Sequence, residues 1–257
     1  MTHLRKHAWV LSLAVLLAVL LALTKIIQPG FGASGIESLA RAALPFGFAT
    51  AGMAVVIIAG GIDLSVASMI AVCAVTTAVL MERMAGVPAL IIVLLAGAAM
   101  GAINGALIIL TRVPDIVVTL AMLFVWEGVA LLILSSPGGA TADWLEGAIR
   151  GSFIFSWLPK AFLIIAIVSA LLWGPLRRTK LGLSIYAIGS DELAAFRSGI
   201  SVGRTKIAAY SICGLFCAFG GLSLAALTGI GEPVPGPYLM ASVAAVVLGG
   251  VVLGGGK

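Results

Sequence analysis

A charged segment separates two long apolar runs in the second half of the chain. Arg177–Lys206 holds eight of the twenty-five charged side chains, and six of these eight are Arg or Lys. The runs on either side, Leu158–Trp173 and Ile207–Leu227, carry a single charge between them. Such runs belong in the hydrocarbon of a bilayer, so the segment between them must lie in water. Its excess of basic residues predicts a cytoplasmic loop.

The composition extends this interpretation to the whole chain. Hydrophobic residues make up 61% and charged residues 10%, whereas soluble proteins contain roughly 45–50% and about 25%. We therefore predict an all-α, polytopic membrane protein with one transmembrane domain over residues 1–257. The apolar runs predict seven full crossings and an eighth, Ala241–Leu253, that is shorter than the roughly twenty residues needed. The net charge of +5 has its largest cluster in one loop, so a lipid membrane rather than nucleic acid is the expected partner.

The first apolar run, Ala8–Leu23, follows Arg5 and Lys6. A basic start before a hydrophobic stretch is typical of a signal peptide or of an uncleaved first span. We find no small-x-small cleavage site after it, and an uncleaved span gives the next segment the external start that the cytoplasmic loop requires. We therefore predict a first span with a cytoplasmic N-terminus. The external segments that follow are predicted at Gln28–Ser38 and Ser135–Pro159.

A pair of glycines ends the second apolar run. Leu44–Ile58 is followed by Gly60 and Gly61, and the next apolar run starts only a few residues later. This connection is too short for a solvated loop, so we predict a helix break inside the bilayer or at its edge, surrounded by protein or by a water-filled cavity. Asp63 or Ser65 can cap the new helix. Broken helices recur along substrate paths, and a plain tight turn without substrate contact is the alternative.

Three glycines recur every four residues in the span Pro88–Leu110, at Gly97, Gly101 and Gly105. Small residues at this spacing let two membrane helices approach closely. Asn104 lies beside this glycine seam. Its amide needs a partner, which either a helix contact or an aqueous path would supply, and the helix contact is the commoner outcome.

Glu127 is a carboxylate within the span Ile116–Leu134. An acid at the centre of a span costs roughly 2.5–3.5 kcal/mol on insertion scales, so it usually faces a cavity or a partner. If the span starts nearer Val113, Glu127 lies closer to the outer interface and needs no such role. Thr119, in the same span, supplies a hydroxyl suited to a path for a neutral solute. The candidate pathway residues are Asp63, Asn104, Thr119 and Glu127.

Within the charged loop, Asp191–Arg197 is good helix-forming sequence. Ser190 or Asp191 can cap its first turn, and Gly199 suits its C-terminal end. This short helix would plug a groove on a partner protein or rest on the membrane surface. Its apolar side chains are Ala194, Ala195 and Phe196.

Three motifs follow one another along the chain. They are Gly60-Gly61-Ile62-Asp63-Leu64-Ser65-Val66, then Tyr186-Ala187-Ile188-Gly189 with Ala194-Ala195 and Ser198-Gly199-Ile200, and finally Ala244-Ala245-Val246-Val247-Leu248-Gly249-Gly250. The order and rough spacing of these motifs are similar to those in the ribose-type sugar permeases, which are membrane subunits of ATP-binding-cassette importers. The resemblance covers the chain from about Ala42 to its end.

The resemblance implies a permease subunit that carries a sugar or a sugar-like solute across the bacterial inner membrane and catalyses no covalent change. It implies three partners: an ATPase subunit that binds the ATP, a periplasmic solute-binding protein and a second permease chain. No cofactor is expected in the chain itself. Relatives continue beyond the glycine-rich ending, so C-terminal spans are expected to be missing here. The resemblance also implies that the charged loop contacts the ATPase and transmits its movements to the membrane helices. The residues assigned to this coupling loop are Gly189, Asp191, Ala194, Ala195 and Gly199.

Other chemistry finds little support in the residues. His3 and His7 precede the first span, which excludes an intramembrane zinc site of the HExxH type, and no metal is expected. The carboxylates are too scattered for a paired-carboxylate hydrolase, so no catalytic residue is assigned. The alternative function is an ion-coupled secondary transporter of a small polar solute. Such transporters usually contain several acidic residues within their spans and an internal repeat, whereas Glu127 is the one acid expected deep in a span here.

Overall fold

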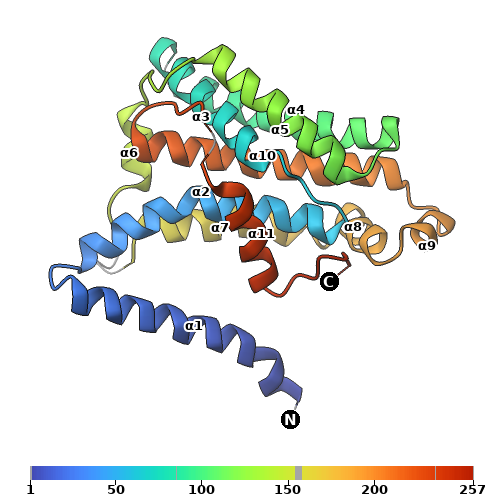
Figure 1. Cartoon of the computed structure of the whole chain (residues 1–257), viewed down its shortest axis with the longest axis horizontal. Helices are drawn as coiled ribbons and strands as arrows, with labels where there is room; N and C mark the ends of the chain where they lie inside the picture. Colours follow the sequence, from blue (N-terminus) through green and yellow to red (C-terminus); the bar gives the residue numbers. More distant parts are fainter. Residues whose placement is uncertain (1, 85, 154–157, 235, 257) are drawn as a thin grey trace.

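The computed structural model describes residues 2–84, 86–153, 158–234 and 236–256, with side chains from residue 10 onward (Figure 1). These residues form eleven α-helices joined by loops, and the loops contain two isolated β-bridges. The predicted all-α fold is confirmed. The helices are α1 (Thr2–Ile27), α2 (Ala33–Ile58), α3 (Val66–Arg83), α4 (Val87–Thr111), α5 (Asp115–Ile133), α6 (Asp143–Ile149), α7 (Lys160–Leu176), α8 (Lys180–Ser190), α9 (Glu192–Arg197), α10 (Val202–Thr228) and α11 (Tyr238–Leu248).

Six of the described helices are long and apolar enough to cross a membrane, namely α1, α2, α3, α4, α5 and α10. If α7 and α8 are taken as one span bent by 84°, they supply a seventh crossing. The chain is therefore a polytopic membrane protein, as predicted. α11 has 11 residues and is too short to cross, as expected for the last apolar run.

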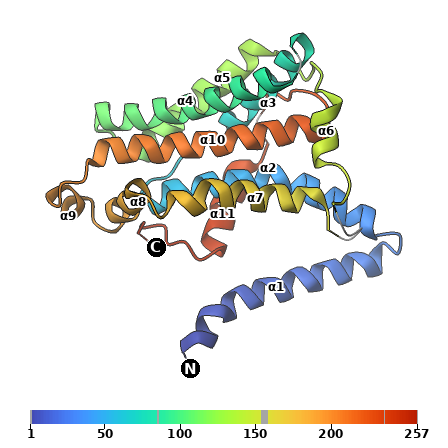
Figure 2. The ribbon, with the colours of Figure 1, turned by 180° about the vertical axis from the view of Figure 1, so that it is seen from behind.

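α10 lies at the centre of the bundle, with α4 on one side, α2 on the other and α3 also against it (Figure 1, Figure 2). The glycine seam makes the contact with α4. A Cβ atom on Gly97 would lie 2.5 Å from the carbonyl oxygen of Gly214, and one on Gly105 would lie 2.8 Å from the Cα atom of Ile207. The backbones of α4 and α10 therefore touch directly, and the predicted close approach is confirmed.

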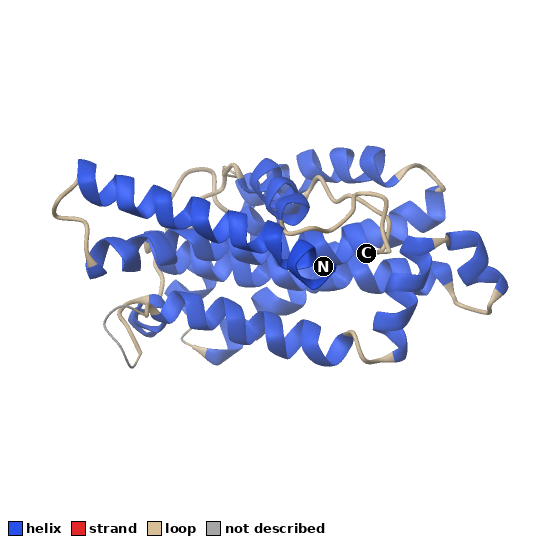
Figure 3. Ribbon diagram, turned by 90° about the horizontal axis from the view of Figure 1, so that it is seen from below, coloured by secondary structure: helices blue, strands red, loops and turns tan. Residues whose placement is uncertain are grey.

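Most of the long helices run along one common direction, and many of their connections lie at the two ends of the bundle (Figure 3). α6 and the link between α1 and α2 lie at one end, whereas α8, α9 and the link between α4 and α5 lie at the other (Figure 1). The structure thus reproduces the predicted alternation of sides. α1 stands apart from the bundle, and none of its stretch Val10–Ile27 is buried.

Three segments predicted as loops are partly helical. α2 already begins at Ala33, so the connection predicted over Gln28–Ser38 is limited to residues 28–32. The external segment Ser135–Pro159 contains α6, with Leu145 and Ile149 buried, while its residues 154–157 lie outside the described residues. The charged loop begins with α8, which packs against α2 and α10. Helices as short as α6 and α8 are held by packing rather than by intrinsic propensity.

Candidate functional site

The connection between α2 and α3 forms the buried break that the sequence predicts. Gly60 adopts a left-handed backbone (φ +86°), which glycine tolerates without strain, and the chain turns back into the bundle (Figure 1). Oδ1 of Asp63 accepts hydrogen bonds from the backbone N–H of Ser65 (2.9 Å) and from its hydroxyl (2.7 Å). Both side chains are fully buried. Protein therefore surrounds the irregular backbone. The N-cap residue of α3 is Ser65, which makes no side-chain capping hydrogen bond, and the bonds to Asp63 form a turn just before the helix.

Asn104 of α4 links this break to α5. Its amide nitrogen donates to the hydroxyl of Ser65 (2.7 Å) and lies 3.4 Å from Oδ2 of Asp63. Its amide oxygen accepts a hydrogen bond from the indole N–H of Trp126 (3.1 Å). Asn104 is fully buried. Of the two kinds of partner considered for this amide, the structure shows the contact between helices.

A second group of contacts lies on the other side of the break. The Thr119 hydroxyl lies 2.8 Å from the carbonyl oxygen of Asp115 and 3.1 Å from that of Ile62. The Tyr210 hydroxyl donates to Oδ2 of Asp115 (2.9 Å). Gly61 is packed against this pair, since a Cβ atom there would lie 2.5 Å from Asp115 Oδ2 and 2.6 Å from the Tyr210 hydroxyl.

These contacts form one polar cluster, which joins the break to α4, α5 and α10. Three of the four predicted pathway residues belong to it, and all three are fully buried. Because their polar atoms are paired within the protein, the cluster fixes the helix break in this conformation. Contact with a transported solute stays a prediction. The members of the polar cluster are Asp63, Ser65, Asn104, Asp115, Thr119, Trp126 and Tyr210.

Glu127 is the predicted pathway residue that lies outside the polar cluster. It is half-buried on α5, and no hydrogen bond or ion pair joins it to another residue within the described ranges. Its side chain leaves the helix roughly 100° away from that of Trp126. It also lies less than two turns from the end of α5 at Ile133. This position agrees with the alternative in which Glu127 lies toward the outer interface.

Sequence reasoning missed three members of the polar cluster: Asp115, Trp126 and Tyr210. A signal for two of them was present, because a buried Trp N–H or Tyr O–H usually finds a hydrogen-bond partner. Trp126 and Tyr210 lie within apolar spans, where such partners are scarce. Asp115 follows Pro114 at the start of α5, and no sequence motif marks it as a member of a buried cluster.

The short helix predicted in the charged loop is present as α9. The Asp191 carboxylate accepts a hydrogen bond from the N–H of Ala194 (2.9 Å), which confirms one of the two predicted caps. Gly199 adopts a left-handed backbone (φ +84°) at the other end. Its N–H donates to the carbonyl of Phe196 (3.0 Å), and the N–H of Ile200 donates to that of Ala195 (3.1 Å). This pair of bonds is a Schellman motif, and it confirms the predicted C-terminal end.

The orientation of α9 corrects the prediction at one position. Ala195 is 5% exposed and packs inward, so it is not part of the outward apolar side. Leu193, which was not predicted, is 57% exposed beside Phe196, which is 66% exposed. Ala194 also faces outward. Leu193 and Phe196 share one face because they are three residues apart, whereas Ala195 lies on the side away from Leu193.

Two contacts attach α8 and α9 to the spans. Lys206 of α10 forms a 2.9 Å ion pair with Glu192 of α9. Gly189, at the end of α8, packs against α2, where a Cβ atom would overlap the carbonyl oxygen of Ile58. A cavity of about 340 Å³ lies beside the ion pair, and its lining includes Glu192, Lys206 and Asp115. α9 and the polar cluster therefore meet at one cavity.

A bundle of six to seven apolar spans, with a buried helix break and a short exposed helix at one end, defines a multi-pass membrane protein. Residues 35–256 match the family described as branched-chain amino acid transport system / permease component, and the chain belongs to this family. The motifs that resemble sugar permeases thus predicted a permease correctly.

Two relatives from Escherichia coli (strain K12) illustrate the similarity. The ribose import permease protein RbsC is 32% identical over 263 residues, which cover 97% of this chain and 80% of the relative. The autoinducer 2 import system permease protein LsrD is 34% identical over 274 residues, which cover 98% of this chain and 79% of the relative. No solved structure matches the chain significantly.

Proposed function

We propose that the chain is the permease subunit of an ATP-driven importer in the bacterial inner membrane, and that it carries a sugar or a sugar-like solute. The family supports a permease, and the two relatives are named for the import of ribose and of autoinducer 2. The chain catalyses no covalent change in this proposal. Hydroxyl and amide groups are sufficient to line a path for a neutral, hydroxyl-rich solute.

The observation that carries this proposal is the exposed apolar face of α9. Leu193 and Phe196 are more than half exposed on a helix that is fixed at both ends. A short rigid helix with two large apolar side chains is suited to a groove on a soluble partner. The partner we assign to it is the ATPase subunit, which would bind the ATP.

A short route connects α9 with the helix break. The ion pair between Glu192 and Lys206 holds α9 to the first turns of α10. Tyr210 lies about one turn further along α10 and donates to Asp115 at the start of α5. Gly61, within the break, touches both members of this hydrogen bond. A displacement of α9 would therefore reach the polar cluster through α10, and we expect these contacts to change between outward-open and inward-open states.

The remaining partners follow from the two ends of the bundle. We assign the end that holds α6 to the periplasmic solute-binding protein, and the end that holds α9, together with the N-terminus, to the cytoplasm. The basic residues of Arg177–Lys206 support this orientation. A second permease chain would complete the path between two sets of helices.

The described residues give no support to an ion-coupled transporter. Asp63 is paired with Ser65 and Asn104, and the neighbouring Asp115 is bonded to Tyr210. Asp63 is also fully buried, so it is not open to a coupling ion in this conformation. The two relatives are likewise named as import permeases.

Reconstitution tests the proposed function. The chain would be incorporated into proteoliposomes with the ATPase and solute-binding protein encoded by neighbouring genes, and uptake of labelled ribose and other monosaccharides would be measured. We expect uptake to require both ATP and the binding protein. Uptake driven by a sodium or proton gradient without ATP would contradict the proposal.

A further inference from the structure

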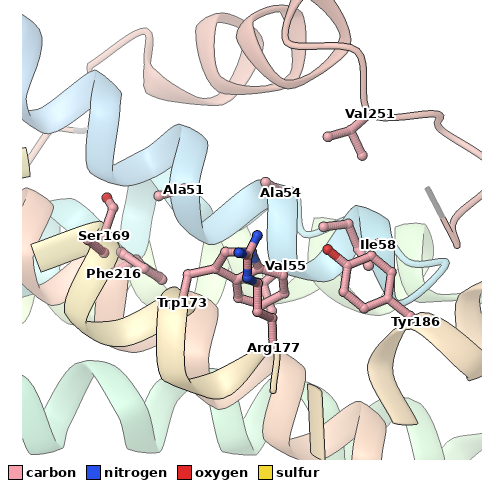
Figure 4. Close-up of a pocket in the computed structure, with 12 residues that line it drawn as sticks. Ala51, Ala54, Val55, Ile58, Ser169, Trp173, Arg177, Tyr186, Phe216 and Val251 are labelled. Atoms are coloured by element: carbon pink, nitrogen blue, oxygen red, sulfur yellow. The ribbon is translucent and has the colours of Figure 1, made fainter. Parts of the chain in front are cut away.

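A cavity of about 560 Å³ lies between α2, α7 and α8, and none of its lining residues belongs to the polar cluster (Figure 4). Ala51 and Ala54 of α2 form one wall, and Trp173 of α7 lies on the facing wall. Phe216 of α10 and Val251 of the C-terminal segment also line the cavity. The small side chains on α2 leave the space that the cavity occupies.

The cavity begins at the adjoining ends of α2 and α7, which we assign to the edge of the membrane, and extends inward. Its lining includes Ile58, the last residue of α2, and Arg177, which directly follows α7. It also includes Ser169, eight residues before Arg177, which corresponds to about 12 Å along a helix. The hydrocarbon core of a bilayer is about 30 Å thick. The cavity therefore occupies less than half of one membrane crossing.

One end of the cavity is cationic and the rest is mainly apolar. In the view of Figure 4 the Arg177 side chain overlaps Trp173, and Tyr186 lies to one side. The ring centroids of Trp173 and Tyr186 are 6.1 Å apart. The described lining residues include no acidic side chain. The remaining polar side-chain groups are the hydroxyls of Ser169 and Tyr186 and the indole N–H of Trp173. The cation thus lies at the boundary of the membrane with no carboxylate beside it in the cavity.

We propose that this cavity binds one anionic phospholipid, with its phosphate at Arg177 and its acyl chain along Ala51 and Ala54. Basic pockets between membrane helices bind acidic lipid headgroups, and arginine is well suited to phosphate because its donors form a planar fork. The apolar walls match the start of an acyl chain, and the depth of about 12 Å places that chain parallel to α7.

Other occupants fit the cavity less well. A free sugar would bury many hydroxyl groups against walls that offer few hydrogen-bond partners, which costs free energy. A lipid without net charge would be attracted less strongly to the Arg177 guanidinium. A second copy of this chain would also cover the apolar walls, and it is an outcome of the test below.

Native mass spectrometry tests the proposal on the purified chain. The protein would be released from detergent micelles that contain equal amounts of phosphatidylglycerol and phosphatidylcholine. We expect wild-type protein to retain phosphatidylglycerol about fivefold in preference, the factor that one basic side chain at a membrane surface supplies. Arg177→Gln should remove this preference. Arg178→Gln is the matched control, because it removes the neighbouring cation, which is outside the cavity lining.

A second variant tests the position of the acyl chain. Ala54→Phe adds a ring at the apolar wall and keeps Arg177, so it should also reduce the bound phosphatidylglycerol. An unchanged preference in Arg177→Gln would overturn the proposal, and so would an equal loss in Arg177→Gln and Arg178→Gln, which would indicate attraction to the whole basic surface. A lipid-free wild-type dimer that Ala54→Phe converts to a monomer would assign the cavity to a second copy and would also overturn it.

Discussion

Tyr210 donates a hydrogen bond of 2.9 Å to Asp115, which lies 95 residues earlier in the chain. The bond joins α10, which follows α9, to the first residue of α5. Gly61 touches both side chains, so this bond also borders the break between α2 and α3. A single hydroxyl thus connects three elements that are distant in sequence.

Tyr210→Phe is expected to uncouple ATP hydrolysis from transport. The ring keeps its packing, but Asp115 loses one donor, at a cost of about 1 kcal/mol because this carboxylate is only partly buried. Membrane insertion should be retained, while the amount of solute taken up per ATP hydrolysed should fall in the reconstituted importer. Tyr238→Phe removes a hydroxyl from α11 and serves as the control. An unchanged ratio would show that the bond plays no part in coupling.

Gly61→Ala should destabilise the protein. Its new Cβ atom would lie 2.5 Å from Asp115 and 2.6 Å from Tyr210, so one of these side chains must move. Overpacking of this kind costs about 1–3 kcal/mol. The thermal unfolding midpoint in detergent should fall, whereas Gly128→Ala, at a helical glycine with open space around it, should have little effect. Equal midpoints for the two variants would argue against close packing at the break.

If Glu127 lines the path, Glu127→Gln should reduce transport without reducing the amount of protein in the membrane. Glu127 lies outside the polar cluster, so its replacement breaks none of the hydrogen bonds described there. A role in the path would therefore appear in solute uptake alone. If both uptake and membrane yield stay at the wild-type level, Glu127 is an interfacial side chain and leaves the set of pathway residues.

Phe196→Asp should weaken association with the ATPase. It places a charge on the exposed apolar face of α9 and leaves the caps of that helix intact. Copurification of the ATPase and solute-stimulated ATP hydrolysis should fall together. Leu183→Asp is the matched control, since Leu183 is 62% exposed at the same end of the bundle but belongs to α8. Ala195→Arg is a poorer test, because Ala195 is buried against its own chain. Intact association in Phe196→Asp would indicate a helix that rests on the membrane surface.

Cysteines introduced at Ser152 and Ser190 should react with a membrane-impermeant reagent from opposite sides of the membrane. Both positions are exposed, and they belong to the α6 and α8 ends of the bundle. We expect Ser152→Cys to label from outside and Ser190→Cys from the cytoplasm. The three native cysteines are fully buried, so the unmodified chain serves as the negative control for labelling. Labelling of both variants from outside would refute the proposed orientation.

The spans were predictable because long apolar runs have one stable place, the bilayer. The seam at Gly97 and Gly105 was predictable for a similar reason, since a four-residue spacing places glycines on one helix face. Asp191 and Gly199 carry local signals for the two ends of a helix. In contrast, Asp115 pairs with Tyr210 at a separation of 95 residues, and no local sequence pattern encodes that pairing. The inward turn of Ala195 likewise depends on packing, because one turn of helix has too few residues to mark its buried side.

Direct contact between the backbones of α4 and α10 limits how the transporter can rearrange. At Gly97 and Gly214 no side chain separates the two helices, so they cannot slide past each other without collision. We therefore expect α4 and α10 to move together as one rigid body during a transport cycle. α2 and α7 enclose a cavity along part of their length and have room to part. The gate of this permease is therefore expected on the side of α2 and α7.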